Sequence, residues 1–402
     1  MAALTGVRAL PAGGLWRPVV TLGVTQIIGF GTIYYAFGVM VAPLGAELGL
    51  SQTFAYGALS AALLAGSMLA PLAGRLIDRQ GARVMMAAGS LAMALAFVLM
   101  SRVTGGATLF AALALVEVVA ALVLYDAAFA ALAQAVGPRR ARRAITLMTL
   151  LGGFASTVFW PLTLVLLEGL GWRGTYLAFG ALHLLICLPL HLSLARPVPP
   201  TGAVTDSETG FTPLPVALHG RAMLLLGVGF SLSWVVMSAF SAQWVPVLVA
   251  LGLTQTAAVA AGTLMGPAQV AARVLEMVFV GHRHPMLTAL VAMACLALAV
   301  GVLVVAPIGL ASASVFALLF GVGQGLATMV RGTVPLALFG LAGYAARLGR
   351  LASLRMVVAA ASPFAMAGSL SLLGASVTLV LAGLLALAAL AAMALVPWRG
   401  AH

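Results

Sequence analysis

Residues 74–83, GRLIDRQGAR, place three arginines and an aspartate between two long apolar runs, 52–73 and 84–100. Only 7% of the chain is charged, so this stretch concentrates a scarce kind of residue. Two glycines flank the charges, and glycine permits a tight turn. The pattern predicts a short polar loop between two hydrophobic helices.

The composition of the whole chain predicts an integral membrane protein. The 402 residues are 63% hydrophobic, and the mean hydropathy is +1.17. A water-soluble core of this size needs a larger polar coat than eight acids and twenty bases provide. Apolar runs of about 18 residues or more recur along the chain, and they lack the alternation of barrel strands. We therefore expect an all-α membrane protein.

We expect about twelve transmembrane helices. The expected spans are 18–44, 52–74, 84–102, 107–136, 144–169, 172–194, 221–250, 255–280, 285–306, 309–339, 352–373 and 376–397. The stretch between the sixth and seventh spans is rich in Pro, Thr and Gly and predicts a cytoplasmic linker. The predicted organisation is an N-terminal tail (1–17), a six-helix bundle (18–194), the linker (195–220), a second six-helix bundle (221–397) and a C-terminal tail (398–402).

The basic residues predict the orientation of these spans. All twenty are arginine, and most lie in the termini and in every second loop. The other loops hold only Arg102 and Arg173. By the positive-inside rule, both termini are expected in the cytoplasm. Arginines scattered over short loops do not form the single basic face that nucleic-acid binding needs, so no nucleic-acid partner is expected.

The two halves of the sequence resemble each other. LGLSQT at 48–53 corresponds to LGLTQT at 251–256, and Pro43 corresponds to Pro246. The offsets are roughly 200 residues, about half the chain, which predicts a duplicated six-helix unit. Repeats of this kind are typical of secondary transporters, whose binding site lies between the repeats.

The loop at 74–83 resembles the signature loop of the major facilitator superfamily, whose pattern is roughly Gly-x-x-x-Asp-Arg-x-Gly-Arg-Arg. Ala82 departs from the first of the two final basic positions. The matching residues are Gly74, Asp78, Arg79, Gly81 and Arg83. The resemblance extends over the whole chain through the twelve spans, the linker and a degenerate second copy. It implies the fold of that superfamily, two pseudo-symmetric six-helix bundles.

The resemblance also implies that Asp78 helps to close the cytoplasmic side. The expected partners are the arginines at 139–143 and the start of span eleven, near Leu351, because an anion stabilises a helix N-terminus. The alternative is that the arginines only anchor the topology. In the second copy, Arg273 and Glu276 are expected to form a structural pair. The expected cytoplasmic gate comprises Gly74, Arg75, Asp78, Arg79, Gly81, Arg83, Arg142 and Arg143.

Ionisable residues within the expected spans are functional candidates because burial in a membrane is costly, and four of them stand out. They are Glu117, Asp126, Arg331 and Arg355. We expect Asp126 to pair across the halves with Arg331 or Arg355 when the protein faces outward. The alternative is that each pairs within its own half. Glu117 has no obvious basic partner and suits a proton carrier, or else it bonds a neighbouring hydroxyl or lies at a wet surface.

Polar and aromatic residues in the spans provide a candidate substrate pocket, because the resemblance implies that the first helix of each half lines the cavity. Such residues suit an organic solute held by stacking and a few hydrogen bonds. The alternatives are plain packing and interfacial belts. The candidate pocket residues are Gln26, Tyr34, Tyr35, Tyr56, Trp160, Trp234 and Gln324.

The sequence favours an organic anion or a neutral hydrogen-bonding or aromatic solute. Span one contains no acid, which argues against a cation-selective pump, and Arg331 lies deep in span ten. WRGTYLAFG at 172–180, together with span one, resembles the monocarboxylate and oxalate-formate branch of the superfamily.

We therefore predict a proton-coupled secondary transporter that works by alternating access, a monomer in a bacterial inner membrane. No Walker A, HExxH or GxSxG pattern is present, so neither ATP hydrolysis nor another enzymatic activity is expected. No cofactor or metal is expected. The alternatives are a drug or metabolite efflux antiporter, a metal-ion carrier and a non-transporting membrane receptor.

Overall fold

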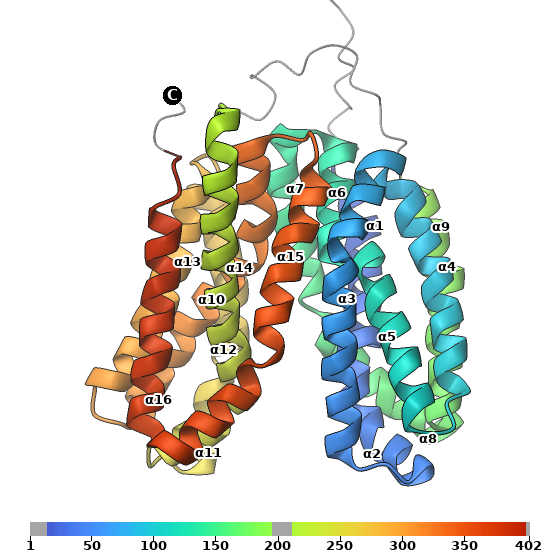
Figure 1. Cartoon of the computed structure of the whole chain (residues 1–402), viewed down its shortest axis with the longest axis horizontal. Coiled ribbons are helices and arrows are strands. Elements are labelled where there is room, and N and C mark those ends of the chain that lie inside the picture. The colour runs from blue at the N-terminus through green and yellow to red at the C-terminus, as the bar shows by residue number, and fades with distance from the viewer. Residues whose placement is uncertain (1–13, 195–210, 399–402) are drawn as a thin grey trace, which may run out of the picture.

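A computed structural model of the chain describes residues 14–194 and 211–398, apart from a few side chains within the helices. Most of the expected linker and of both tails lies outside these ranges. The described elements are all helices, arranged as two bundles side by side (Figure 1). Figure 1 also shows that the last helix, in red, ends at the same end of the molecule at which the helix following the linker, in yellow-green, begins. We call this end the terminal end.

The first bundle contains the helices up to residue 192. Its elements are α1 (Trp16–Phe30), η2 (Gly31–Tyr35), α2 (Ala36–Leu48), α3 (Gln52–Gln80), α4 (Ala82–Ser101), α5 (Gly106–Val123), α6 (Tyr125–Val136), α7 (Pro138–Gly152), α8 (Ala155–Leu182), η3 (His183–Cys187) and α9 (Leu188–Leu192). Both η elements have the wider π-helical turn, a feature that often marks functional sites.

The second bundle begins after the linker. Its elements are α10 (Val216–Ala250), α11 (Gln255–Gly262), α12 (Met265–Leu275), the π-helical η5 (Glu276–Val280), α13 (Pro285–Val305), α14 (Leu310–Phe339), α15 (Tyr344–Ala360) and α16 (Ser362–Ala394). Leu214, in the described part of the linker, is tied to this bundle, because its N–H donates to the Leu338 carbonyl over 2.8 Å.

Ten described helices are long and apolar enough to cross a membrane. Two of these ten run past a glycine with positive φ, Gly171 (φ 65°) in α8 and Gly374 (φ 79°) in α16. The left-handed region suits glycine, and a helix cannot continue straight through it. Each glycine therefore divides one helical run into two passages, and a hydrogen bond of 2.8 Å joins Ser369 to Thr378 across Gly374. The count agrees with the expected twelve spans.

Two helices begin six or more residues earlier than hydropathy predicts. The fifth passage starts at Pro138 instead of residue 144, and the eleventh starts at Tyr344 instead of residue 352. Both extensions carry arginines, so a hydropathy window ends before the helix does. Hydropathy measures the part of a helix that lies in hydrocarbon, whereas the hydrogen-bonded helix continues into the polar region.

The expected fourth span, 107–136, is broken. Leu124 is extended (φ −87°, ψ −170°), so α5 ends at Val123 and α6 begins at Tyr125. The Val123 carbonyl accepts a hydrogen bond of 2.8 Å from the Gln26 side chain. A backbone carbonyl freed inside a membrane needs a new donor, and Gln26 supplies it.

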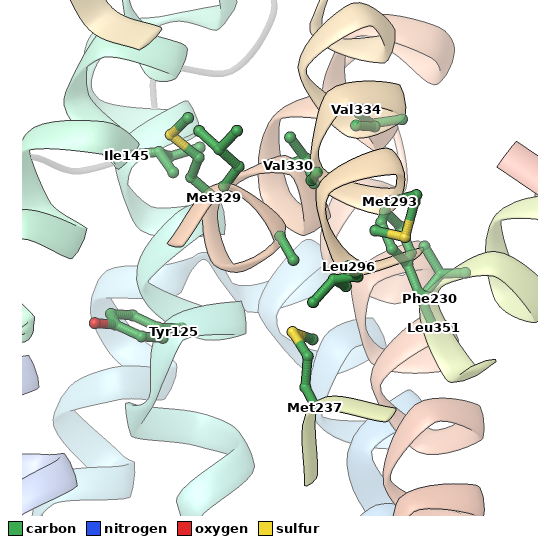
Figure 2. Packing of buried hydrophobic residues seen from close by; sticks show 14 of the residues in the cluster. Tyr125, Ile145, Phe230, Met237, Met293, Leu296, Met329, Val330, Val334 and Leu351 are labelled. Carbon is green, nitrogen blue, oxygen red and sulfur yellow. The ribbon is translucent and has the colours of Figure 1, made fainter. Parts of the chain in front are cut away.

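Apolar side chains join the bundles near the terminal end. Figure 2 shows Ile145 of α7 beside Met329 of α14, and both residues are fully or almost fully buried.

Within the second bundle, Gly321 lets α14 approach α12 closely. A Cβ at Gly321 would lie 2.6 Å from the Met265 carbonyl oxygen. Small residues at such crossings are what lets membrane helices pack.

Gly321→Ala is therefore expected to force α12 and α14 apart and to lower the free energy of unfolding by about 1–3 kcal/mol, the usual cost of overpacking. Thermal unfolding of the purified protein in detergent measures this. Gly301→Ala in α13 is the matched control, because a Cβ there meets nothing within 4 Å. Equal melting temperatures for the two variants would contradict this account of the packing.

Candidate functional site

A cavity of about 760 Å³ lies between the two bundles. Its walls come from α1, η2, α3, α5, α6, α7 and α8 of the first bundle and from α10, α12, α14 and α15 of the second. Five ionisable side chains of the described residues other than tyrosine line it, namely Glu117, Asp126, Arg273, Arg331 and Arg355. Three cations thus face two acids, and the cavity carries a positive excess in an otherwise apolar protein.

The break at Leu124 places Asp126 in this cavity. Because α6 starts at Tyr125, Asp126 lies in the first turn of a new helix, where the helix dipole favours a negative charge. Its carboxylate faces the second bundle. Arg355 Nη2 lies 3.6 Å from Asp126 Oδ2, and Arg331 Nε lies 4.0 Å from Asp126 Oδ1. Of the two arrangements considered from the sequence, the structure has the pairing across the halves.

The three residues Asp126, Arg331 and Arg355 form what we call the charge cluster. Both arginine side chains are buried, with 10% of Arg331 and 7% of Arg355 exposed, whereas 26% of the Asp126 side chain is exposed. The N–O separations exceed the 2.7–3.2 Å of ordinary hydrogen bonds. Among the described residues, the Nε atom of each arginine has no hydrogen-bond partner. The opposite charges therefore lie near each other, but the hydrogen-bonding capacity of the arginines is not filled.

Aromatic rings surround the two guanidinium groups. Arg355 lies over the ring of Trp234 at 4.5 Å, and Arg331 lies 5.6 Å from the same ring. Tyr125 and Phe129 lie 5.3 Å and 5.6 Å from Arg331. These contacts fall within the range at which a ring face attracts a cation, so Trp234 supports both arginines at once.

Glu117 lies on the first-bundle wall of the same cavity and is buried. The Tyr34 hydroxyl donates a hydrogen bond of 3.4 Å to its Oε2. Its Oε1 is buried with no hydrogen-bond partner among the described residues. Gly66 allows α3 to pass close behind, because a Cβ at that position would lie 2.7 Å from the Glu117 carbonyl. The Tyr34 hydroxyl is thus a partner of Glu117, and the role of Glu117 as a proton carrier stays a prediction.

Four of the expected pocket residues line the cavity, namely Tyr34, Tyr35, Trp234 and Gln324. The two tyrosines belong to the π-helical turn η2. Gln324 accepts from the Gln269 side chain over 2.9 Å and donates to the Ser241 hydroxyl over 3.3 Å. These contacts form a neutral polar patch on the second-bundle wall.

Two expected pocket residues lie elsewhere. Gln26 is fully buried and bonds the Val123 carbonyl, so it supports the break in the fourth passage instead of facing a solute. Tyr56 is 42% exposed and packs edge-on against Phe37, away from the cavity. The side chain of Trp160 lies outside the part of the chain that the structure describes.

Asp78 lies against the beginning of α15. Its two carboxylate oxygens accept hydrogen bonds from the Ala345 and Ala346 backbone N–H groups, over 3.0 and 2.8 Å. Gly74 makes this approach possible, because a Cβ there would collide with the Ala345 carbonyl. The contact is with helix-terminal amides at residues 345–346, not near Leu351. Gly81 (φ 86°) then ends α3 in a conformation that glycine favours.

Arg142, one of the expected partners of Asp78, contacts other groups. Arg142 bonds Glu276 of the second bundle, the Arg283 carbonyl and, over 3.1 Å, the Thr288 hydroxyl. Glu276 is therefore paired with Arg142 and not with Arg273. Of the remaining gate residues, Arg75, Arg79 and Arg143 are exposed and Arg83 is half-buried.

Arg273 was expected to be only structural, yet it lines the cavity and crosses between the bundles. Its Nε donates to the Gly325 carbonyl and its Nη1 to the Thr149 carbonyl of α7, each over 3.1 Å. Gln269 is a further lining residue that sequence reasoning missed. The repeat contained a signal for the contact surface, because Arg273-x-x-Glu276 occupies the place of Arg75-x-x-Asp78 in the second half.

The comparisons with known proteins agree with this architecture. A family model described as Major Facilitator Superfamily matches residues 22–343. No curated protein matched the chain in a sequence comparison. The human organic anion transporter MFSD10 (TETRAN) has a similar structure, with a TM-score of 0.73 and 15% identity, covering 96% of this chain and 100% of the other.

The transporter FucP in its outward conformation is also similar, with a TM-score of 0.70 and 12% identity, covering 94% of this chain and 98% of the other. At these identities the two structures show the fold alone. The family match spans most of the chain, from within α1 to the loop before α15. The chain belongs to the major facilitator superfamily and is a multi-pass membrane transporter.

Proposed function

We propose that this transporter carries small organic anions. The observation that supports the proposal is the charge of the cavity, where three arginines face two acids. The remaining walls are largely apolar and aromatic, which suits the organic part of a solute. The similar fold of the human organic anion transporter MFSD10 is consistent with this substrate class.

The protein works by alternating access between two bundles, and the described state faces outward. Two sets of polar contacts between the bundles, from Asp78 to α15 and from Arg142 to Glu276, lie at the terminal end. Figure 1 shows the ribbons of the two bundles diverging toward the opposite end. With both termini in the cytoplasm, as the distribution of arginines indicates, the cytoplasmic side is closed.

Glu117 is the group that couples transport to protons. It is buried, it faces the cavity, and its described partners comprise one hydroxyl and no cation. A carboxyl group in this setting exchanges a proton when the cavity is open to water on one side and then the other. Asp126 is already matched by two arginines, so it is less suited to this role.

Proteoliposomes containing Glu117→Gln test the coupling role. With an imposed pH gradient, accumulation of labelled 2-naphthalenesulfonate, which stays ionised and so does not cross the bilayer unaided, is expected to fall to the level without a gradient. Exchange of labelled for unlabelled anion is expected to continue, because it needs no net proton movement. Glu168→Gln is the control, since Glu168 is exposed. Unchanged accumulation in Glu117→Gln would refute the role, and uptake of neutral analogues only would refute the proposed anion class.

Asp78 latches the cytoplasmic side shut through the two amides at the start of α15. In Asp78→Asn the charge is lost and one oxygen remains to accept. Hydrogen bonds to charged groups contribute roughly 1.5–3 kcal/mol, so exchange of the Ala345 and Ala346 amides is expected to become about tenfold faster or more. Hydrogen–deuterium exchange with mass spectrometry measures this in the peptide that begins α15. Unaltered exchange there would show that the latch does not depend on the carboxylate.

A further inference from the structure

We infer that the anionic head group of the substrate binds to Arg331 and Arg355 and competes there with Asp126, and that the substrate is an aromatic carboxylate or sulfonate. This inference rests on the proposed function and extends it, because it names the receptor groups and the kind of anion. It also implies that the Asp126 carboxylate occupies the two arginines when no substrate is bound.

The first support is the incomplete hydrogen bonding of the two arginines. Both side chains are at least nine-tenths buried, both line the cavity, and the Nε of each has no hydrogen-bond partner among the described residues. A buried donor without an acceptor is costly, so such a group points to an occupant. Two oxygens of a carboxylate or sulfonate can accept two parallel hydrogen bonds from the planar guanidinium group.

The second support is the balance of charge. Asp126 is the one acid within ion-pair distance of Arg331 and Arg355 among the described residues, so the charge cluster keeps one positive charge. Arg273 donates to two carbonyls and brings no negative partner of its own. A monoanion brings the sum of the charged groups that line the cavity, three cations and two acids, to neutrality, whether or not Asp126 keeps its contact with the arginines. A neutral solute leaves the excess in place and a cation increases it, and both are unfavourable in a low-dielectric site.

The third support is that Asp126 is placed to leave. Its side chain is more exposed than either arginine, and its distances of 3.6 and 4.0 Å are those of a loose contact. A solute carboxylate that makes hydrogen bonds of ordinary length to the same arginines competes with it successfully. Because Asp126 belongs to the first bundle and both arginines to the second, this exchange also removes a tie between the bundles.

The aromatic character of the substrate follows from the walls. Trp234 lies against both arginines, and Tyr34, Tyr35, Tyr125 and Phe30 line the same cavity. A ring attached to the head group therefore finds ring partners beside the anion site, where offset or edge-on stacking is favourable.

The wall of α14 adds a polar group at a defined distance. Gln324, Thr328 and Arg331 all line the cavity and are spaced four and three residues apart, which places them on one face of the helix. At 1.5 Å per residue, Gln324 lies about 10 Å along the helix from Arg331. A substrate with its anion at Arg331 can thus present a second polar group to Gln324.

Binding of 2-naphthoate to the purified full-length protein tests the inference, with its neutral counterpart 2-naphthamide as the matched ligand. Isothermal titration calorimetry gives each Kd. We expect 2-naphthoate to bind at least about tenfold more tightly than the amide, since hydrogen bonds to charged groups contribute on that scale. Arg331→Gln and Arg355→Gln are expected to raise the Kd of 2-naphthoate about tenfold, whereas Asp126→Asn is expected to lower it.

Arg102→Gln is the control variant, because Arg102 is exposed and lies outside the cavity. Arg355→Lys keeps the charge and loses the fork, and is expected to give an intermediate Kd. Melting temperatures identify any variant that fails to fold. If a glutamine variant fails to fold, the lysine variant at the same position is used to measure the change in Kd.

Two outcomes overturn the inference while the proposed function stands. One is a Kd for 2-naphthoate that both arginine variants leave unchanged, and the other is weaker binding in Asp126→Asn, which would make Asp126 part of the receptor. A protein that binds 2-naphthamide as tightly as 2-naphthoate, and accumulates no organic anion in proteoliposomes, would instead refute the proposed function itself.

Discussion

The charge cluster of Asp126, Arg331 and Arg355 constrains the rest of the structure, because three charges are held inside a membrane protein between two separate bundles. Removing one partner from a buried ion pair typically costs about 3–5 kcal/mol, so the stability of each bundle depends on the other. The surrounding rings, the broken fourth passage and the position of Trp234 all serve to bring these charges together. Since one carboxylate cannot satisfy two guanidinium groups, the same cluster that joins the bundles also favours a further anion.

The contacts at the terminal end follow the duplication of the chain. Asp78 in the second passage reaches the start of the eleventh, and Glu276 in the eighth passage reaches Arg142 near the start of the fifth. Each acid thus contacts the beginning of the fifth helix of the opposite half. The chemistry differs, because Asp78 binds backbone amides whereas Glu276 binds a guanidinium. The duplicated positions have kept their place in the fold and have acquired different partners.

The sequence was sufficient for the fold and for part of the site. Hydropathy and the two-fold repeat predict twelve passages in two bundles, and scarce charges such as Asp126 and Arg355 are easy to find in apolar helices. The partners of those charges were harder to predict. No proline or glycine marks the break at Leu124 in the sequence. The freed carbonyl, that of Val123, is satisfied by the Gln26 side chain from another helix. For the same reason, Gln26 was wrongly predicted to line the pocket. Glu276 pairs with Arg142, which is distant in sequence, and not with its sequence neighbour Arg273.

Every basic residue of this protein apart from histidine is an arginine, and the cations of the cavity are therefore all guanidinium groups. A guanidinium stays protonated throughout the pH range in which cells live, whereas a buried amine readily gives up its charge. The attraction of the cavity for negative charge is thus a permanent property of the empty carrier. Within that pH range, a link between proton supply and cargo at the described site has to involve one of its two carboxyl groups.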